Sequence, residues 1–188
     1  MTEPRLSPVP ESEWDDETRE MMAVLGGLGE EGRVLNVFTT LAHHPKLLKR
    51  WNVFGAHVLI KTSLPERLRE LLILRTGWVC RTPYEWGQHV IIARELGITD
   101  EEISRIAEGP DAGWGELEAA ALRAVDELSE QRTITDPTWE VLSRHLDPQQ
   151  LLDLIFTVGQ YTTVAMFTNA VRIEPDDGVT GVPTPRRP

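Results

Sequence analysis

The chain has 188 residues, of which 40% are hydrophobic and 26% charged, as expected for one globular domain with a modest core. Its formal net charge of −11 argues against nucleic acid and anionic membranes as partners, because both attract basic surfaces. The single cysteine, Cys80, excludes an internal disulfide and agrees with a reducing compartment. The N-terminus shows no basic-then-apolar signal pattern, so we expect a cytoplasmic protein.

Helix-start signals recur from the N-terminus onward, whereas alternating strand patterns are scarce. Residues 1–11 contain three prolines and predict an extended arm. Ser12, with acidic residues in the turn that follows, predicts a helix that ends at Gly26 and Gly27. Pro45 predicts the start of the next helix, which has large apolar residues at helical spacing.

Later helices are predicted from N-cap residues, helix-favouring prolines and apolar periodicity. Their expected starts are Ser63, Thr82, Thr99, Leu117, Asp136 and Asp147. Ser63 with Glu66, and Thr82 with Glu85, have the spacing of capping boxes. We expect the Thr82 helix to stop at Gly97 and the Thr99 helix to end before Gly109.

The segment from Leu151 to Val171 is the longest apolar stretch of the chain. Polar residues interrupt it, so it predicts a buried helix rather than a membrane span. Residues 174–188 hold four prolines and predict an extended tail. The sequence therefore predicts an all-α bundle of six or more helices, with a single domain over residues 12–173.

Glu85 and His89 are the leading candidates for catalytic chemistry. They lie four residues apart on one predicted helix, so their side chains share a face, and that face continues into apolar residues. An inward-facing carboxylate and imidazole are costly to bury unless they pair with each other or with a ligand. Such a pair is able to transfer protons near neutral pH. The alternative is structural: Glu85 caps its own helix, and His89 is a satisfied core histidine.

Other polar residues are open to structural or functional interpretation. Glu70, within the apolar run 68–74, is either a further catalytic carboxylate or part of a solvated helix face. Arg75 is a candidate for binding an anion or a carboxylate. We interpret Cys80 as a small buried hydrophobic residue. His43 and His44 lack a third ligand at suitable spacing, so no metal site is predicted.

Three stretches of the sequence resemble the carboxymuconolactone decarboxylase and alkylhydroperoxidase D-like superfamily. They are Leu64-Pro-Glu-Arg-Leu-Arg-Glu-Leu-Leu-Ile-Leu-Arg75, Tyr84-Glu-Trp-Gly-Gln-His89 and Ala93-Arg-Glu-Leu-Gly-Ile-Thr-Asp-Glu-Glu-Ile103. With flanking helices, the resemblance extends over roughly residues 35–172. It implies a helical bundle of the alkylhydroperoxidase D-like type.

The resemblance also implies which chemistry is retained. Redox members of the superfamily use a glutamate, a Cys-x-x-Cys pair and a histidine. Here Glu70 and His89 match the outer two residues, whereas Thr82 and Glu85 occupy the cysteine positions. A dithiol peroxidase needs one thiolate to attack and another to resolve the product, so hydroperoxide reduction is not expected.

The decarboxylase-like members work without cysteines or a cofactor. By resemblance we predict a cofactor-independent acid–base enzyme that acts on a small carboxylated or lactone-type substrate. His89 transfers the proton, Glu85 orients His89 or shares the proton, and Glu70 is a further catalytic candidate. The candidates for holding the substrate are Tyr84, Arg75, Trp86 and Thr82. An isomerisation, dehydration or ring cleavage by the same pair remains open, as does a non-catalytic helical oligomer that binds a small molecule.

The resemblance further implies self-association, since members of the superfamily form dimers, trimers and larger rings. Six tryptophans and a long apolar C-terminal helix in a short chain support this expectation, because they leave apolar surface to be covered. We therefore expect a homo-oligomer, either a dimer, a trimer or a hexamer.

Overall fold

The computed structural model describes residues 3–25, 34–176 and 183–188, and in these ranges it contains nine α-helices and no strand. The helices are α1 (Asp16–Leu25), α2 (Asn36–Leu41), α3 (Pro45–Ala56), α4 (Glu66–Val79), α5 (Pro83–Glu95), α6 (Asp100–Glu108), α7 (Glu116–Gln131), α8 (Asp136–His145) and α9 (Pro148–Val171). A 3₁₀ turn, η1 (Glu11–Glu13), precedes α1, and a π-helical turn, η4 (His57–Lys61), extends α3. The predicted all-α fold is confirmed.

Helix α4 is the centre of the bundle. It packs against α5, α6, α7 and α9, and every residue from 68 to 77 is buried. Its Leu68 and Leu72 join a core with residues of α7, α8 and α9, whereas Leu71 and Leu74 join a second core with α5 and α6. Because apolar partners surround α4, any polar side chain in its middle is withdrawn from water.

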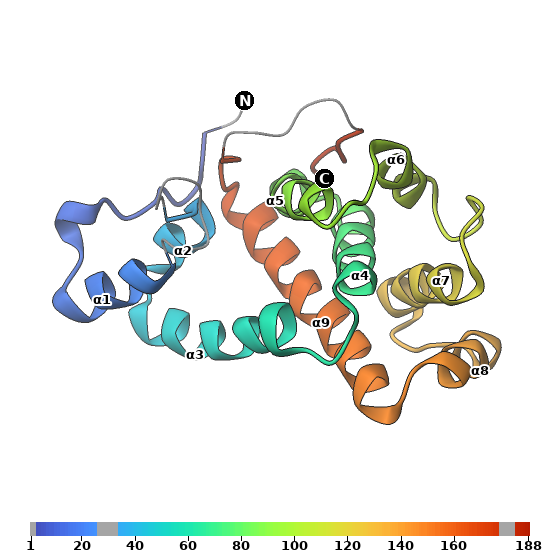
Figure 1. Ribbon diagram of the computed structural model, residues 1–188. Helices are drawn as coiled ribbons and strands as arrows, with labels where there is room; N and C mark the ends of the chain where they lie inside the picture. The colour runs from blue at the N-terminus through green and yellow to red at the C-terminus, as the bar shows by residue number, and fades with distance from the viewer. Residues whose placement is uncertain (1–2, 26–33, 177–182) are drawn as a thin grey trace.

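Helix α9 runs through the middle of the molecule, with α1–α3 on one side and α4–α8 on the other (Figure 1). It is long and apolar enough to cross a membrane by length and composition, but 56% of its most apolar window is buried inside the protein. A helix buried in this way serves as a core helix of the fold, as the sequence predicts. Asp153, its only charged residue, is buried and accepts hydrogen bonds from Ser63.

Both ends of the described chain lie beside the C-terminal end of α9. The Arg5 amide donates to the carbonyl of Val171, and Arg187 donates to the carbonyl of Ile173. Asp176, just beyond α9, accepts hydrogen bonds from Tyr84 on α5 and from the amide of Asn36 on α2. The segment after α9 therefore ties α2 to α5.

Several helix starts differ from the sequence prediction. The first helix begins at Asp16, because Asp15 rather than Ser12 accepts the hydrogen bond from the Thr18 amide. Its predicted end, Gly26 and Gly27, lies outside the described residues. Ser63 does not cap α4, since its amide and hydroxyl both donate to Asp153 instead. By contrast, the capping box of Thr99 forms as predicted.

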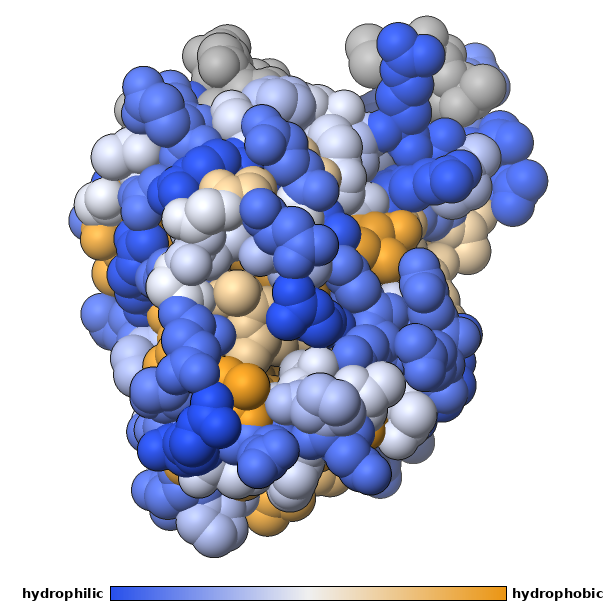
Figure 2. Space-filling model, turned by 90° about the vertical axis from the view of Figure 1, so that its right-hand side faces the viewer, coloured by the Kyte–Doolittle hydropathy of each residue, from blue (hydrophilic) through white to orange (hydrophobic). Residues whose placement is uncertain are grey.

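Charged and apolar residues are distributed unevenly over the surface. The side of the molecule that carries α6–α8 is mainly hydrophilic, with small separate apolar patches (Figure 2). Apart from Val24 on α1, the exposed large apolar residues on the other helices lie on α3, η4 and α9. They are Leu47, Val53, Phe54, Ile60, Leu152, Phe156 and Met166.

Candidate functional site

The candidate site forms where α4 and α5 pack closely together. A short turn joins the two helices, and Arg81 in this turn has a positive φ of 52°. Gly77 on α4 faces the backbone of α5, where an added Cβ would lie 3.4 Å from the Trp86 amide nitrogen. This close approach brings the middle of α4, which carries Glu70, against the face of α5 that carries His89.

Glu70 and His89 form a buried hydrogen-bonded pair. Glu70 is fully buried and His89 is 5% exposed, and His89 Nδ1 lies 2.7 Å from Glu70 Oε2. A carboxylate only accepts hydrogen bonds, so Nδ1 is the donor. When the ring is neutral, its other nitrogen, Nε2, then carries the lone pair and is the atom able to accept a proton. Glu70 therefore fixes both the tautomer and the orientation of His89, and its interpretation as part of a solvated helix face is wrong.

Arg69 completes the hydrogen bonding of Glu70. Its Nε donates to Glu70 Oε1 over 3.0 Å, so each carboxylate oxygen has one partner. Arg69 is 7% exposed, which makes Arg69–Glu70–His89 a buried chain of alternating donors and acceptors. Burial alone would raise the pKa of Glu70, but His89 and Arg69 reverse this effect, and the pKa lies below its ordinary value.

Glu85 faces the opposite edge of the His89 ring. Its Oε2 lies 3.9 Å from His89 Nε2, which is too long for a direct hydrogen bond and leaves a gap between the two atoms. The residue is 5% exposed, and its side chain accepts no helix-capping hydrogen bond among the described residues. Burial, aided by the negative charge of Glu70 and opposed by His89, raises the pKa of Glu85 to about 7.

The pKa of His89 depends on its burial and on the neighbouring carboxylates. Burial lowers its pKa, but the carboxylates of Glu70 and Glu85 outweigh burial, so the pKa lies above the ordinary value of 6.5. Tyr161 of α9 packs its ring against the imidazole at a centroid distance of 4.9 Å and an angle of 88°. The site thus places a basic imidazole between an ionised and a readily protonated carboxyl group, which is an arrangement suited to proton transfer.

Three further predicted residues lie on α5 or just before it, but not beside the imidazole. Thr82 bonds to the hydroxyl of Thr168 and does not cap α5. The Tyr84 hydroxyl donates to Asp176 over 2.6 Å, so its contacts tie down the C-terminal segment. Trp86 is fully buried in the second core against Trp78, and its indole nitrogen has no hydrogen-bond partner among the described residues.

Arg75 lies one and a half turns further along α4 and is not part of the cluster around His89. It forms two hydrogen bonds to Asp126 of α7, at 2.7 and 2.8 Å, and donates to the carbonyls of Ile106 and Ala107. All three of its guanidinium nitrogens are therefore occupied by the protein. These contacts link α4, α6 and α7 in the way expected of a structural arginine.

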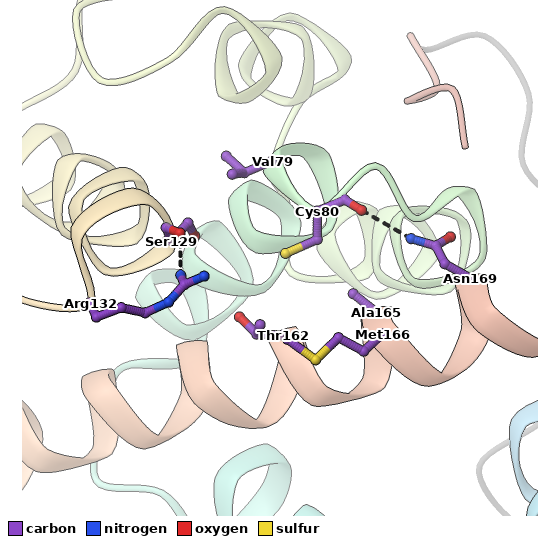
Figure 3. Close-up of a pocket in the computed structure, with 8 residues that line it drawn as sticks. All are labelled: Val79, Cys80, Ser129, Arg132, Thr162, Ala165, Met166 and Asn169. Atoms are coloured by element: carbon purple, nitrogen blue, oxygen red, sulfur yellow. Dashed lines mark hydrogen bonds between the residues drawn. The ribbon is translucent and has the colours of Figure 1, made fainter. Parts of the chain in front are cut away.

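Cys80 lines a cavity of about 240 Å³ between the C-terminal ends of α4 and α7 and the last turns of α9 (Figure 3). Its sulfur points into the space that Thr162 and Met166 also line. Burial raises the pKa of the thiol above its ordinary value, although a hydrogen bond from Thr162 opposes this. The residue is partly exposed rather than fully buried, and its thiol is a weak nucleophile at neutral pH.

Sequence reasoning missed Arg69 and Tyr161. Arg69 directly precedes Glu70 inside an otherwise apolar run, and two adjacent charges in such a run are a signal of a buried polar cluster. Tyr161 adjoins Gln160, one of the polar residues that interrupt the apolar stretch of α9. Among the described residues, no group of three or more potential ligands is placed to hold a metal ion.

A family comparison supports the resemblance seen in the sequence. The profile of the carboxymuconolactone decarboxylase family matches residues 45–127, which include Glu70, Glu85 and His89. The chain matches no curated protein sequence.

Solved structures similar to this chain have the same fold. A peroxidase-related protein from Silicibacter sp. TM1040 has a TM-score of 0.79 at 16% identity, and the match covers 94% of this chain and 95% of the other. An alkylhydroperoxidase AhpD core protein from Ralstonia eutropha JMP134 has a TM-score of 0.80 at 20% identity, with the same coverage. The debrominase Bmp8 in complex with 2,3,4-tribromopyrrole has a TM-score of 0.72 at 15% identity, covering 91% of each chain. The similarities confirm the alkylhydroperoxidase D-like fold.

Proposed function

We propose that this chain, whose residues 45–127 match the profile of the carboxymuconolactone decarboxylase family, is a cofactor-independent acid–base enzyme. Its substrate in this proposal is a small carboxylated or lactone-type organic molecule. The observation that carries the proposal is the 2.7 Å hydrogen bond from His89 Nδ1 to Glu70, which directs His89 Nε2 toward Glu85 across a gap of 3.9 Å. A substrate atom that approaches this gap meets a base and an acid at once.

In the proposed reaction a group beside the gap supplies the proton that replaces the lost carboxylate. Loss of carbon dioxide from a carboxylated lactone leaves the electron pair of the broken C–C bond on carbon, delocalised as an enolate. Protonated His89 or Glu85 then delivers a proton to that carbon, and solvent restores the proton to the enzyme. Glu70 stabilises the positive charge of protonated His89 throughout, as a buried carboxylate partner does for other catalytic histidines. An isomerisation by the same groups would require only the proton-transfer part of this sequence.

Hydroperoxide reduction is a less favoured alternative, considered because two structural neighbours are described as peroxidase-related. That chemistry, when run by a dithiol, needs a second cysteine to resolve the oxidised first one. This chain has a single cysteine, Cys80, and Thr82 and Glu85 stand where the resemblance places the two thiols. The debrominase neighbour shows that the same fold accommodates a small organic ligand. These points support proton transfer on a small molecule.

The proposal is tested with carboxymuconolactone and a panel of small carboxylated lactones. Carbon dioxide release and deuterium incorporation from D₂O are followed for the wild type, His89→Gln and a control, His145→Gln, at an exposed histidine on α8. We expect turnover in the wild type and the control, and its loss in His89→Gln with helicity unchanged. Turnover that survives in His89→Gln refutes the role of His89. Ligand-dependent thermal stabilisation of the wild type without any product would favour the non-catalytic binding protein instead.

We also propose that the chain forms a homo-oligomer. The exposed apolar residues on α3 and α9 support this, and Phe54 and Phe156 already meet edge to face with ring centroids 6.0 Å apart. Asp153 is buried, so the exposed face of α9 carries no charged side chain. Interfaces are depleted of charge in this way, and two copies of a chain with a net charge of −11 would meet most favourably at a neutral face.

A further inference from the structure

Arg69 is buried but only partly paired. The residue is 7% exposed, yet among the described residues its guanidinium bonds through Nε alone, to Glu70. Neither Nη1 nor Nη2 has a hydrogen-bond partner among the described residues, and neither atom is fully shielded from solvent. Both Nη atoms therefore face accessible space. A buried guanidinium normally satisfies its donors, so two free nitrogens require an explanation.

Arg75 on the same helix provides an internal comparison. Its exposure is 9%, close to that of Arg69, but its Nε, Nη1 and Nη2 all donate to Asp126 or to backbone carbonyls. The fold therefore satisfies a buried arginine fully where the arginine has a structural task. Arg69 differs because it stands beside Glu70 and His89 with its two terminal nitrogens unused.

The hydroxyl of Tyr161 has the same property. The side chain is 7% exposed, its ring packs on His89, and its hydroxyl has no hydrogen-bond partner in the described part of the chain. The hydroxyl oxygen of Tyr161 is likewise not fully shielded from solvent. The charge of Arg69 acts on Tyr161, since it opposes the rise in the Tyr161 pKa that burial and the two glutamates cause. Arg69 contacts Glu70, and Tyr161 contacts the His89 ring to which Glu70 is hydrogen-bonded, so both residues flank the same buried pair.

The charges of Arg69, Glu70, Glu85 and His89 indicate which kind of ligand the site would stabilise. In the state in which His89 and Glu85 both hold a proton, Arg69 and His89 carry two positive charges, whereas Glu70 supplies the one negative charge. A buried site with one uncompensated positive charge favours an anion. The planar fork of a guanidinium matches the two oxygens of a carboxylate, and a hydroxyl donor beside it adds a third hydrogen bond.

We propose that Nη1 and Nη2 of Arg69, together with the hydroxyl of Tyr161, bind a carboxylate group of the ligand and hold the adjoining carbon at His89. This inference rests on the proposed function for the identity of the reacting group, but the anion site itself is independent of catalysis. Arg69 and Tyr161 select a singly charged organic carboxylate over its neutral amide or ester. Arg69 rather than Arg75 is the substrate-binding arginine.

The test uses acetate as the probe and acetamide as its neutral counterpart, at constant ionic strength maintained with chloride. Binding is followed by NMR, through the backbone amide signals of α4 and α5 in every protein and, where Arg69 is present, also through its side-chain Nε–H signal. We expect saturable binding of acetate to the wild type and much weaker binding of acetamide. Arg69→Gln should weaken acetate binding at least about tenfold, because a charged two-point contact is lost. Arg69→Lys keeps the charge but not the planar fork, so its acetate affinity should lie between those of the wild type and Arg69→Gln. Tyr161→Phe should lose less acetate affinity than Arg69→Gln.

Two controls separate this inference from the proposed function. His89→Gln should abolish turnover but still bind acetate more tightly than Arg69→Gln does, because it keeps the guanidinium fork, whereas Arg50→Gln, at an exposed arginine of α3, should leave acetate binding unchanged. Circular dichroism checks that each variant folds, and Tyr161→Phe and Arg69→Lys keep the test decisive if Arg69→Gln does not fold. Equal acetate affinity in these variants and the wild type would overturn the proposal. Equal binding of acetamide, or acetate-induced shifts that exclude Arg69, would overturn it as well.

Discussion

Replacing Glu85 by glutamine should change how the stability of the protein depends on pH. In the unfolded chain Glu85 loses its proton near the ordinary pKa of 4.5, whereas in the folded protein it keeps the proton up to about pH 7. Between these values the folded state holds one more proton than the unfolded state, so raising the pH destabilises the fold. One pH unit corresponds to about 1.4 kcal/mol, so the full loss is roughly 3 kcal/mol.

Urea unfolding at pH values from 4.5 to 8 measures this loss. We expect the free energy of unfolding of the wild type to fall relative to that of Glu85→Gln by about 3 kcal/mol between pH 4.5 and 7.5, with parallel curves above that range. His89 also titrates in both proteins, and because Glu85 raises the pKa of His89, the difference between the curves reports Glu85 together with its coupling to His89. Glu95→Gln, at an exposed glutamate near the end of the same helix, is the matched control and should follow the wild type. Parallel curves for Glu85→Gln and the wild type would refute the account of Glu85.

Three further changes test other parts of the structure. Tyr84→Phe removes the hydroxyl that donates to Asp176 and accepts from a backbone amide of α2, and should cost about 1–3 kcal/mol of unfolding free energy in urea. An unchanged midpoint would show that this tie is unimportant. Arg75→Gln leaves Asp126 without its two-point partner and should cost about 3 kcal/mol, measured in the same way; a loss well under 1 kcal/mol would contradict the structural role of Arg75. Phe156→Glu should dissociate the proposed homo-oligomer, and sedimentation that shows equal mass for variant and wild type would exclude that face of α9.

The sequence predicts the helices well where local chemistry decides them. Pro45, the Thr99 capping box and the Asp136 and Asp147 starts all begin helices as expected, because proline and N-cap preferences act within one turn. Predictions fail where a distant partner competes for the capping side chain. The hydroxyl of Ser63 donates to Asp153, 90 residues away, and the hydroxyl of Thr82 is hydrogen-bonded to that of Thr168. No local pattern reveals such competition.

The candidate site is predicted in part for the same reason. The inward position of Glu85 and His89 follows from their spacing on one helix, and both residues are buried. The spacing does not predict which glutamate binds the His89 imidazole. Glu70, on a different helix, makes the 2.7 Å hydrogen bond, whereas Glu85 lies 3.9 Å away. Arg69 and Tyr161 enter the site through the packing of α4 and α9, which depends on the whole bundle. Spacing within one helix cannot report contacts between helices.

The central claim is that Glu70 holds His89 with Nδ1 protonated and Nε2 free to exchange a proton across the gap to Glu85. NMR titration of ¹⁵N-histidine-labelled protein, with the His89 signals assigned by comparison with His89→Gln, tests it directly in the wild type and in Glu70→Gln. We predict that neutral His89 in the wild type is protonated on Nδ1 and titrates above the ordinary value of 6.5, because Glu70 and Glu85 raise its pKa. In Glu70→Gln the His89 pKa should fall, because the negative charge beside Nδ1 is lost. A wild-type ring protonated on Nε2, or a His89 titration that is the same in both proteins, would contradict the claim.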